Sequence, residues 1–252
     1  MGALLRGGRH LIERWTSRED LERVLVVAAH PDDVDFGAAG TVAAWTDAGV
    51  EVAYCIVTDG EAGGEDPSVS RAEMANLRRD EQRAAAKEVG VRSVSFLGYP
   101  DGRLEVSQAL RRDVTRAVRA FRPQLVLAPS PERWWERIHA SHPDHLAAGE
   151  AATCAVYPDA RNPFAHPELL DEGLQPHAVD ELWLMASGAQ NVAVEITGTF
   201  ERKIAALLCH RTQVDDPEGI VERMRAGAAA AAQDAGMPEG SLAEVFRRVV
   251  TS

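Results

Sequence analysis

The chain has 252 residues, of which 45% are hydrophobic and 26% charged. This composition is globular, and the length is one that a single large α/β domain commonly fills. The 39 acidic and 27 basic side chains give a formal net charge of −12, which disfavours nucleic acid and anionic membrane surfaces as partners. No segment approaches the ~18 consecutive apolar residues of a membrane span, and the first residues contain no signal-peptide core. We therefore expect a cytoplasmic protein without membrane insertion.

Apolar runs alternate with helical patterns through the first half of the chain. Strands are expected at residues 24–29, 50–58, 93–97 and 124–129, and helices at 37–48, 71–89 and 107–121. Repeated strand-helix-strand units predict a parallel sheet with right-handed crossovers. The predicted fold class is therefore α/β, a Rossmann-like three-layer sandwich with a mainly parallel sheet.

The second half of the chain has a looser pattern. Residues 157–175 contain three prolines and predict a loop, after which strands are expected at 181–186 and 192–196 and a helix at 218–235. A last helix is expected to begin at residues 238–241. We expect one domain over residues 1–252, with a helical segment over 1–23 and helices over 214–252. The three scattered cysteines form no CxxC pair, so we expect reduced thiols.

Two clusters of histidine and aspartate follow predicted strands. His30-Pro31-Asp32-Asp33 comes directly after the strand at 24–29, and His142-Pro143-Asp144-His145 comes shortly after the strand at 124–129. Ligands bind to open α/β sheets at the carboxyl ends of the strands. The two clusters therefore predict one metal site that is divided between two strand ends.

The residue types in these clusters suggest hydrolytic metal chemistry. Zinc takes imidazole nitrogens and a carboxylate and keeps one position open for water, a set that His30, Asp33 and His145 supply. Asp32 is not part of this set and is free to act as the general base. It could take a proton from a metal-bound water, whose pKa the metal lowers to ~7. His142 is placed to donate to the developing oxyanion or to the leaving amine.

Each residue also has a structural interpretation. Asp32 or Asp33 could cap the helix that follows. The histidines outside the clusters have structural roles by default, with His139 a spare candidate because it shares a loop with His142. They are His10, His139, His166, His177 and His210. A nucleotide-binding module would need a GxGxxG turn after the first strand, which is missing, so no nucleotide is expected.

Six ordered motifs resemble the LmbE-like, PIG-L-type zinc-dependent N-deacetylases over most of the chain. They are Ala29-His30-Pro31-Asp32-Asp33, Thr58-Asp59-Gly60-Glu61, Arg78 with Glu81, Leu97-Gly98-Tyr99-Pro100-Asp101-Gly102, His142-Pro143-Asp144-His145, and Lys203 to Gln213. The resemblance implies a Rossmann-like fold without a nucleotide and hydrolysis of an acetamide on a glucosamine-type sugar. It assigns the metal to His30, Asp33 and His145, the base to Asp32 and the acid or oxyanion role to His142.

The resemblance also implies sugar-holding residues outside the metal cluster, at Glu61, Arg78 and Asp101. The alternative is that Arg78 pairs with Glu81 on its helix and that Asp101 makes a turn. Thr212 replaces the serine usual in the late His-x-Ser-Gln motif, and this departure bears on substrate identity.

We expect a metal-dependent hydrolase that removes an N-acetyl group from a glucosamine-containing small molecule. The ion is expected to be Zn²⁺, with Fe²⁺, Co²⁺ or Ni²⁺ as substitutes. One alternative is an amidase of the same fold for a larger acyl group, on a thiol conjugate or a natural-product intermediate. A more distant one is a non-catalytic α/β ligand-binding module. The sequence is compatible with a homo-oligomer.

Overall fold

The computed structural model describes residues 12–251 except 17, 19 and 65. The described strands form an eight-stranded sheet in the order β1-β7-β8-β6-β5-β2-β3-β4. The strand bounds are β1 (Glu13–Arg14), β2 (Arg23–Ala28), β3 (Glu51–Thr58), β4 (Ser93–Tyr99), β5 (Leu125–Pro129), β6 (Glu181–Met185), β7 (Val192–Glu195) and β8 (Ala243–Val250). Only β8 runs antiparallel to its neighbours, so the mainly parallel α/β fold is confirmed.

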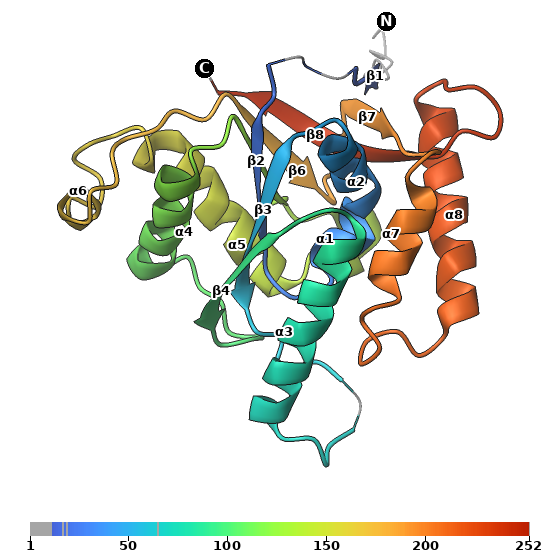
Figure 1. Ribbon diagram of the computed structural model, residues 1–252, viewed down its shortest axis with the longest axis horizontal. Coiled ribbons are helices and arrows are strands. Elements are labelled where there is room, and N and C mark those ends of the chain that lie inside the picture. The colour runs from blue at the N-terminus through green and yellow to red at the C-terminus, as the bar shows by residue number, and fades with distance from the viewer. Residues whose placement is uncertain (1–11, 17, 19, 65, 252) are drawn as a thin grey trace, which may run out of the picture.

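Helices cover both faces of the sheet (Figure 1). Their bounds are α1 (Asp33–Gly37), α2 (Ala39–Asp47), α3 (Arg71–Glu88), α4 (Gln108–Phe121), η1 (Trp135–Ala140), α5 (Pro143–Cys154), η2 (Ala155–Asp159), α6 (Glu168–Asp171), α7 (Phe200–Leu207) and α8 (Pro217–Asp234). Val24 and Val26 of β2 pack into a core with α2, α3, α7 and α8, while Leu25 and Val27 pack into a second core with α4 and α5. Burial on both faces explains the uninterrupted apolar runs of the parallel strands.

The strands at the centre of the sheet lie within one or two residues of their predicted positions, and α8 matches the helix expected at 218–235. The helix expected at 37–48 is instead two helices, α1 and α2, because a break at Ala38 separates them. The loop expected at 157–175 contains the end of η2 and the short helix α6. Cys55 is buried and the other two cysteines are half-buried, and all three are free thiols.

Both ends of the chain differ from the prediction. The helix expected to begin at 238–241 is wrong, because residues 243–250 form strand β8 between β6 and β7. The helical segment expected over 1–23 lies partly outside the described residues, and its described part contains β1 and no helix. Among the residues that the structure describes, no helix has the length and apolarity needed to cross a bilayer.

Candidate metal centre

The two His-Asp clusters meet at the carboxyl edge of the sheet, at the point where the order of the strands reverses. From β2 the chain continues to β3 and β4 on one side and then returns to β5 on the other side of β2. The loops after β2 and β5 therefore diverge at a topological switch point, the usual ligand site of such sheets. His30 follows β2, and α5, which carries His145, follows β5. This topology brings together two histidines that are 115 residues apart in the chain.

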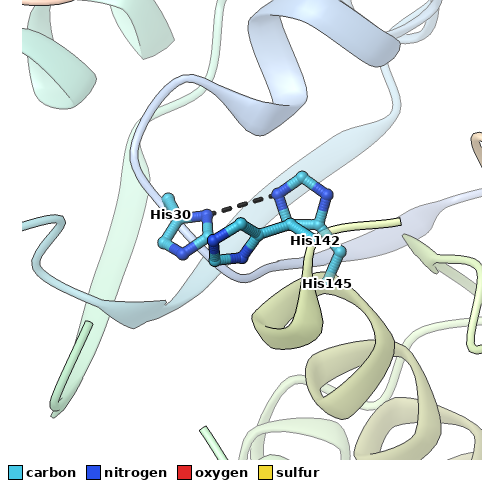
Figure 2. Close-up of side chains that lie close together, drawn as sticks. All are labelled: His30, His142 and His145. Atoms are coloured by element: carbon cyan, nitrogen blue, oxygen red, sulfur yellow. Dashed lines mark hydrogen bonds between the residues drawn. The ribbon is translucent and has the colours of Figure 1, made fainter. Parts of the chain in front are cut away.

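The three predicted ligands converge on one point. His30 Nδ1 lies 3.3 Å from His145 Nε2, and His145 Nε2 lies 2.9 Å from Asp33 Oδ1. The second Asp33 oxygen, Oδ2, is 3.6 Å from His30 Nδ1. Figure 2 shows the rings of His30, His142 and His145 facing one another. Two imidazole nitrogens and a carboxylate at this separation are a donor set that could hold a zinc-type ion.

The outer nitrogens of both rings have partners of the kind that metal-bound histidines need. His30 Nε2 lies 3.1 Å from Asp101 Oδ1 and 3.2 Å from Asp144 Oδ2, and His145 Nδ1 lies 3.5 Å from the Ala140 carbonyl oxygen. Such contacts fix the tautomer and turn the remaining nitrogen of each ring toward the metal position. The outer contacts therefore fit a metal at the point where Nδ1 of His30 and Nε2 of His145 meet.

The charges around the rings favour a cation. Burial lowers the pKa of His30, but hydrogen bonds to Asp101 and Asp33 outweigh it and raise the pKa to about 11. Burial also opposes ionisation of Asp33, yet the neighbouring His145 and His30 hold the pKa of this carboxyl well below its usual range. A position that stabilises positive charge this strongly suits a divalent ion, whose ligands are an ionised carboxylate and neutral imidazoles.

The capping interpretation of the aspartate pair is wrong. Asp32 precedes α1 but makes no side-chain capping bond, and it has a φ of 94°. The carboxylate of Asp33 turns back and accepts a hydrogen bond from the His30 amide at 2.8 Å. Both side chains therefore face the site.

Asp32 is held by an arginine that is itself buried. The Arg78 guanidinium, 4% exposed, donates to Asp32 Oδ2 at 3.0 Å and to the carbonyl oxygens of Pro31 and Gly60. A Cβ atom on Gly60 or on Gly63 would collide with this guanidinium, which accounts for the glycines of that loop. Burial raises the pKa of Asp32 to about 6 against the opposing charge of Arg78.

A buried network of hydrogen-bonded side chains, which the sequence does not predict, holds the backbone amide of Asp32. Gln82 Oε1 accepts from the Asp32 amide at 2.8 Å, and Gln82 Nε2 donates to Asp35 Oδ2 at 2.9 Å. The same Asp35 oxygen lies 2.7 Å from His210 Nε2. Gln82, Asp35 and His210 all have 0% exposure. His210 had been assigned a default structural role, and only its place within the motif from Lys203 to Gln213 could have pointed to this contact.

His142 differs from the two inner histidines. It is exposed, and its Nδ1 accepts from the Asp144 amide at 3.2 Å, which leaves Nε2 directed away from the helix as the protonated nitrogen. Partial burial and the nearby rings of His30 and His145 lower the pKa of His142. Its ring centroid lies 5.0 Å from that of His30. A neutral imidazole here can donate one hydrogen bond into the pocket.

The three predicted sugar-holding residues have different positions. Arg78 and Asp101 line the pocket of about 370 Å³ that contains the metal position, together with Asp32, His139 and His142. Glu61 lies behind Asp101 and accepts from its amide at 2.9 Å. The proposed pairing of Arg78 with Glu81 is wrong, since Glu81 instead accepts from the amide and hydroxyl of Thr212.

Asp144 was not assigned a role from the sequence, although it lies inside the second cluster. It is 1% exposed and accepts from the amides of Gly102 and Leu104 as well as contacting His30 Nε2. It therefore joins the loop after β4 to the metal position.

Comparisons with known proteins show that the chain is similar to a family and to individual relatives over most of its length. Residues 25–156 match the family model described as PIG-L, GlcNAc-PI de-N-acetylase. The diacetylchitobiose deacetylase of Thermococcus kodakarensis is 33% identical over 207 residues, covering 81% of this chain and 73% of that protein. The probable N-acetyl-alpha-D-glucosaminyl L-malate deacetylase 2 of Bacillus cereus is 29% identical, covering 76% and 84%.

The fold is also that of a solved relative. The structure of N,N'-diacetylchitobiose deacetylase from Pyrococcus horikoshii superposes with a TM-score of 0.84 at 34% identity. The match covers 92% of this chain and 85% of that one. The similarity therefore extends well beyond the residues 25–156 that the family model matches.

Proposed function

The chain belongs to the PIG-L family of de-N-acetylases, hydrolases of N-acetyl amides, and from this premise we propose that it is a zinc-dependent deacetylase of N-acetylglucosamine-containing small molecules. The observation that carries the proposal is the convergence of His30 Nδ1, Asp33 and His145 Nε2 beside a carboxylate left out of that set, Asp32. The chemistry is an amide plus water giving acetate plus a free amine. The larger-acyl amidase and the non-catalytic module are not favoured, because the named relatives are deacetylases.

In this proposal His30, Asp33 and His145 hold Zn²⁺. When bound, such an ion polarises a carbonyl group and lowers the pKa of water. Iron, cobalt or nickel can substitute, since a site with these ligands is selected by metal availability as well as by affinity.

Asp32 is the proposed general base. With a pKa of about 6 it is mostly ionised at pH 7 and still basic enough to take a proton from water. Arg78 fixes the carboxylate, so the proton acceptor is oriented before the substrate arrives.

His142 is the proposed hydrogen-bond donor opposite Asp32. His142 lines the pocket, where its Nε2–H can donate a hydrogen bond to the developing oxyanion. When protonated to imidazolium, the ring can instead pass a proton to the departing amine and return to its neutral form. Arg78 and Asp101 are the proposed contacts for sugar hydroxyls, because both line the pocket. Glu61 supports Asp101 through its amide.

The test is metal content combined with amine release. We expect about one equivalent of zinc or iron by mass spectrometry in protein purified without added metal, and fluorescamine-reactive amine from N-acetylglucosamine or one of its glycosides. Release of acetate in equal amount would identify the acyl group. Failure to bind metal even after zinc is supplied would contradict the proposal.

A further inference from the structure

A second hollow opens beside the metal pocket. It has a volume of about 650 Å³ and shares Asp33, His139 and His145 with the metal pocket, so the two adjoin at the metal position. Most of its wall is apolar, and the apolar residues that line it include Phe36, Trp134, Met185, Met224, Ala228 and Ala231. We call this space the apolar pocket.

Small residues of α8 give the apolar pocket its depth. Gly227, Ala228 and Ala231 lie on the helix face that lines it, and a Cβ atom on Gly227 would have no atom within 4 Å. Larger side chains at these positions would occupy the space. These small residues of α8 therefore leave room in the pocket, which Asp33 and His145 of the two His-Asp clusters also line.

The charged residues of the wall have partners already. Lys203 and Glu244 form a buried pair at 2.7 Å, and Arg223 lies 3.3 Å from Asp216. The guanidinium of Arg137 lies over the Trp134 ring at 5.1 Å. Lys203 and Glu244 are thus paired with each other and Arg223 with Asp216, and most of the wall is apolar. Its surface suits hydrocarbon or an aromatic ring.

An acetyl group does not account for the apolar pocket. A methyl group occupies a small part of 650 Å³, and the relatives that are named for their reaction remove acetyl. The remaining part of the substrate is the group that the sugar carries, which the names of those relatives give as a second sugar or malate, both polar. The wall described here differs from what such groups require.

We propose that the apolar pocket binds an alkyl or aryl aglycone of the N-acetylglucosamine substrate. The inference rests on the proposed function, because it places the sugar in the metal pocket. Each methylene removed from water contributes a factor of about four in affinity when it is fully buried. An aglycone of six carbons is therefore expected to strengthen binding by at least tenfold.

Binding can be measured without turnover. We would titrate N-acetylglucosamine and its hexyl glycosides of both anomeric forms into the zinc-loaded Asp32→Asn protein by calorimetry. At least one hexyl glycoside should bind at least tenfold more tightly than the free sugar, with a negative heat-capacity change, which marks burial of apolar surface. Equal affinities for the free sugar and both glycosides would overturn the inference.

Matched variants locate the effect. Ala231→Phe, or Gly227→Leu as a second filling variant, should reduce the preference for the hexyl glycoside about tenfold. Ala230→Phe on the same helix is the control, because Ala230 is exposed and lies outside the wall. An equal loss in the control would overturn the inference. So would a preference for N-hexanoylglucosamine in place of the hexyl glycoside, since the pocket would then take the acyl chain.

Amine release separates this inference from the proposed function. If the wild-type protein binds the hexyl glycoside preferentially but releases no amine from any N-acetylated sugar, the deacetylase proposal fails while the aglycone pocket stands. If amine is released equally fast from the free sugar and from both hexyl glycosides, with equal affinities, the aglycone pocket fails while the deacetylase stands.

Discussion

The parallel half of the sheet, β5-β2-β3-β4, carries titratable side chains at its carboxyl edge, whereas the mixed half, β6-β8-β7-β1, contributes only part of the wall of an apolar pocket. The family model matches residues 25–156, which contain the parallel half except for the first two residues of β2. Strands β6, β7 and β8 and helix α8 follow later in the chain, and β1 precedes this segment. In this molecule the reaction chemistry therefore comes from the parallel half, whereas the apolar pocket is built jointly by α1 and the loop after β5 and by β6, β8 and α8.

The largest expected effect lies in the parallel half. His145→Ala removes one of three converging donors, so we expect loss of the metal and of all amine release. Mass spectrometry of the purified variant measures the metal directly. His177→Ala is the control, because the His177 side chain bonds to the Pro123 carbonyl oxygen and lines neither pocket, so the variant should keep one metal per chain. Full metal content in His145→Ala would contradict the ligand assignment.

Asp32→Asn should keep the metal and lower kcat by at least a factor of about 10², since general-base catalysis contributes 10²–10⁴. The amide is close in shape to the carboxylate, and asparagine tolerates a positive φ. Metal analysis and the fluorescamine assay on the same sample distinguish the two effects. Near-full activity would show that another group takes the proton.

The contacts of Lys203 between the two halves are expected to contribute to the free energy of unfolding. Lys203 of α7 donates to the Asp35 and Phe36 carbonyl oxygens of α1 and to Glu244 of β8. Lys203→Met leaves Glu244 buried without its cation and should cost about 3 kcal/mol of unfolding free energy. Urea denaturation measures this loss. Lys87→Met, at an exposed position, should change stability by less than about 0.5 kcal/mol, and equal losses in the two variants would contradict the role of the buried pair.

Gln82→Met tests whether the hydrogen-bond network of Gln82, Asp35 and His210 positions Asp32. The variant removes the bonds to the Asp32 amide and to Asp35 while keeping the length of the side chain. We expect kcat to fall about tenfold, with KM and metal content nearly unchanged, because small displacements of a reacting group are costly. Arg83→Ala, at the next and half-exposed position, is the control. A parallel loss of metal would indicate a structural role instead.

The smallest effect is a dependence on pH. Asp32 must be ionised to accept a proton, so kcat/KM should fall as pH decreases through its pKa, which burial raises to about 6. We expect half the plateau value near pH 6 and less below it. Rates between pH 5 and 8 with metal content checked at each point give the profile. An acid limb near pH 4 would mean that Asp32 ionises as an ordinary exposed carboxyl.

The sequence predicted the parallel half well because its strands are buried on both faces and read as unbroken apolar runs. It also placed His30, Asp33 and His145 in one cluster, because each motif directly follows a predicted strand or opens the next helix. The roles of Asp144, Gln82 and His210 could not be predicted, since each depends on contacts between segments far apart in the chain.

Strand β8 was mistaken for a helix for a physical reason. Residues 242, 245, 246 and 249 are apolar with helical spacing, and Ser241 with Glu244 resembles a capping box. In the structure, Glu244 instead accepts from the Gly40 and Thr41 amides and from Lys203. Pairing with β6 and β7 and this buried pair override the local pattern. The apolar pocket could not be predicted either, because β8 forms part of its wall.

The backbone of Asp32 has a consequence for laboratory evolution of this protein. A non-glycine residue at a φ of 94° carries a conformational cost of about 1–3 kcal/mol. Glycine would remove that cost together with the carboxylate. A selection for heat resistance alone would therefore enrich glycine at position 32 and return robust proteins without a base, so thermostable libraries of this chain need selection for turnover at every round.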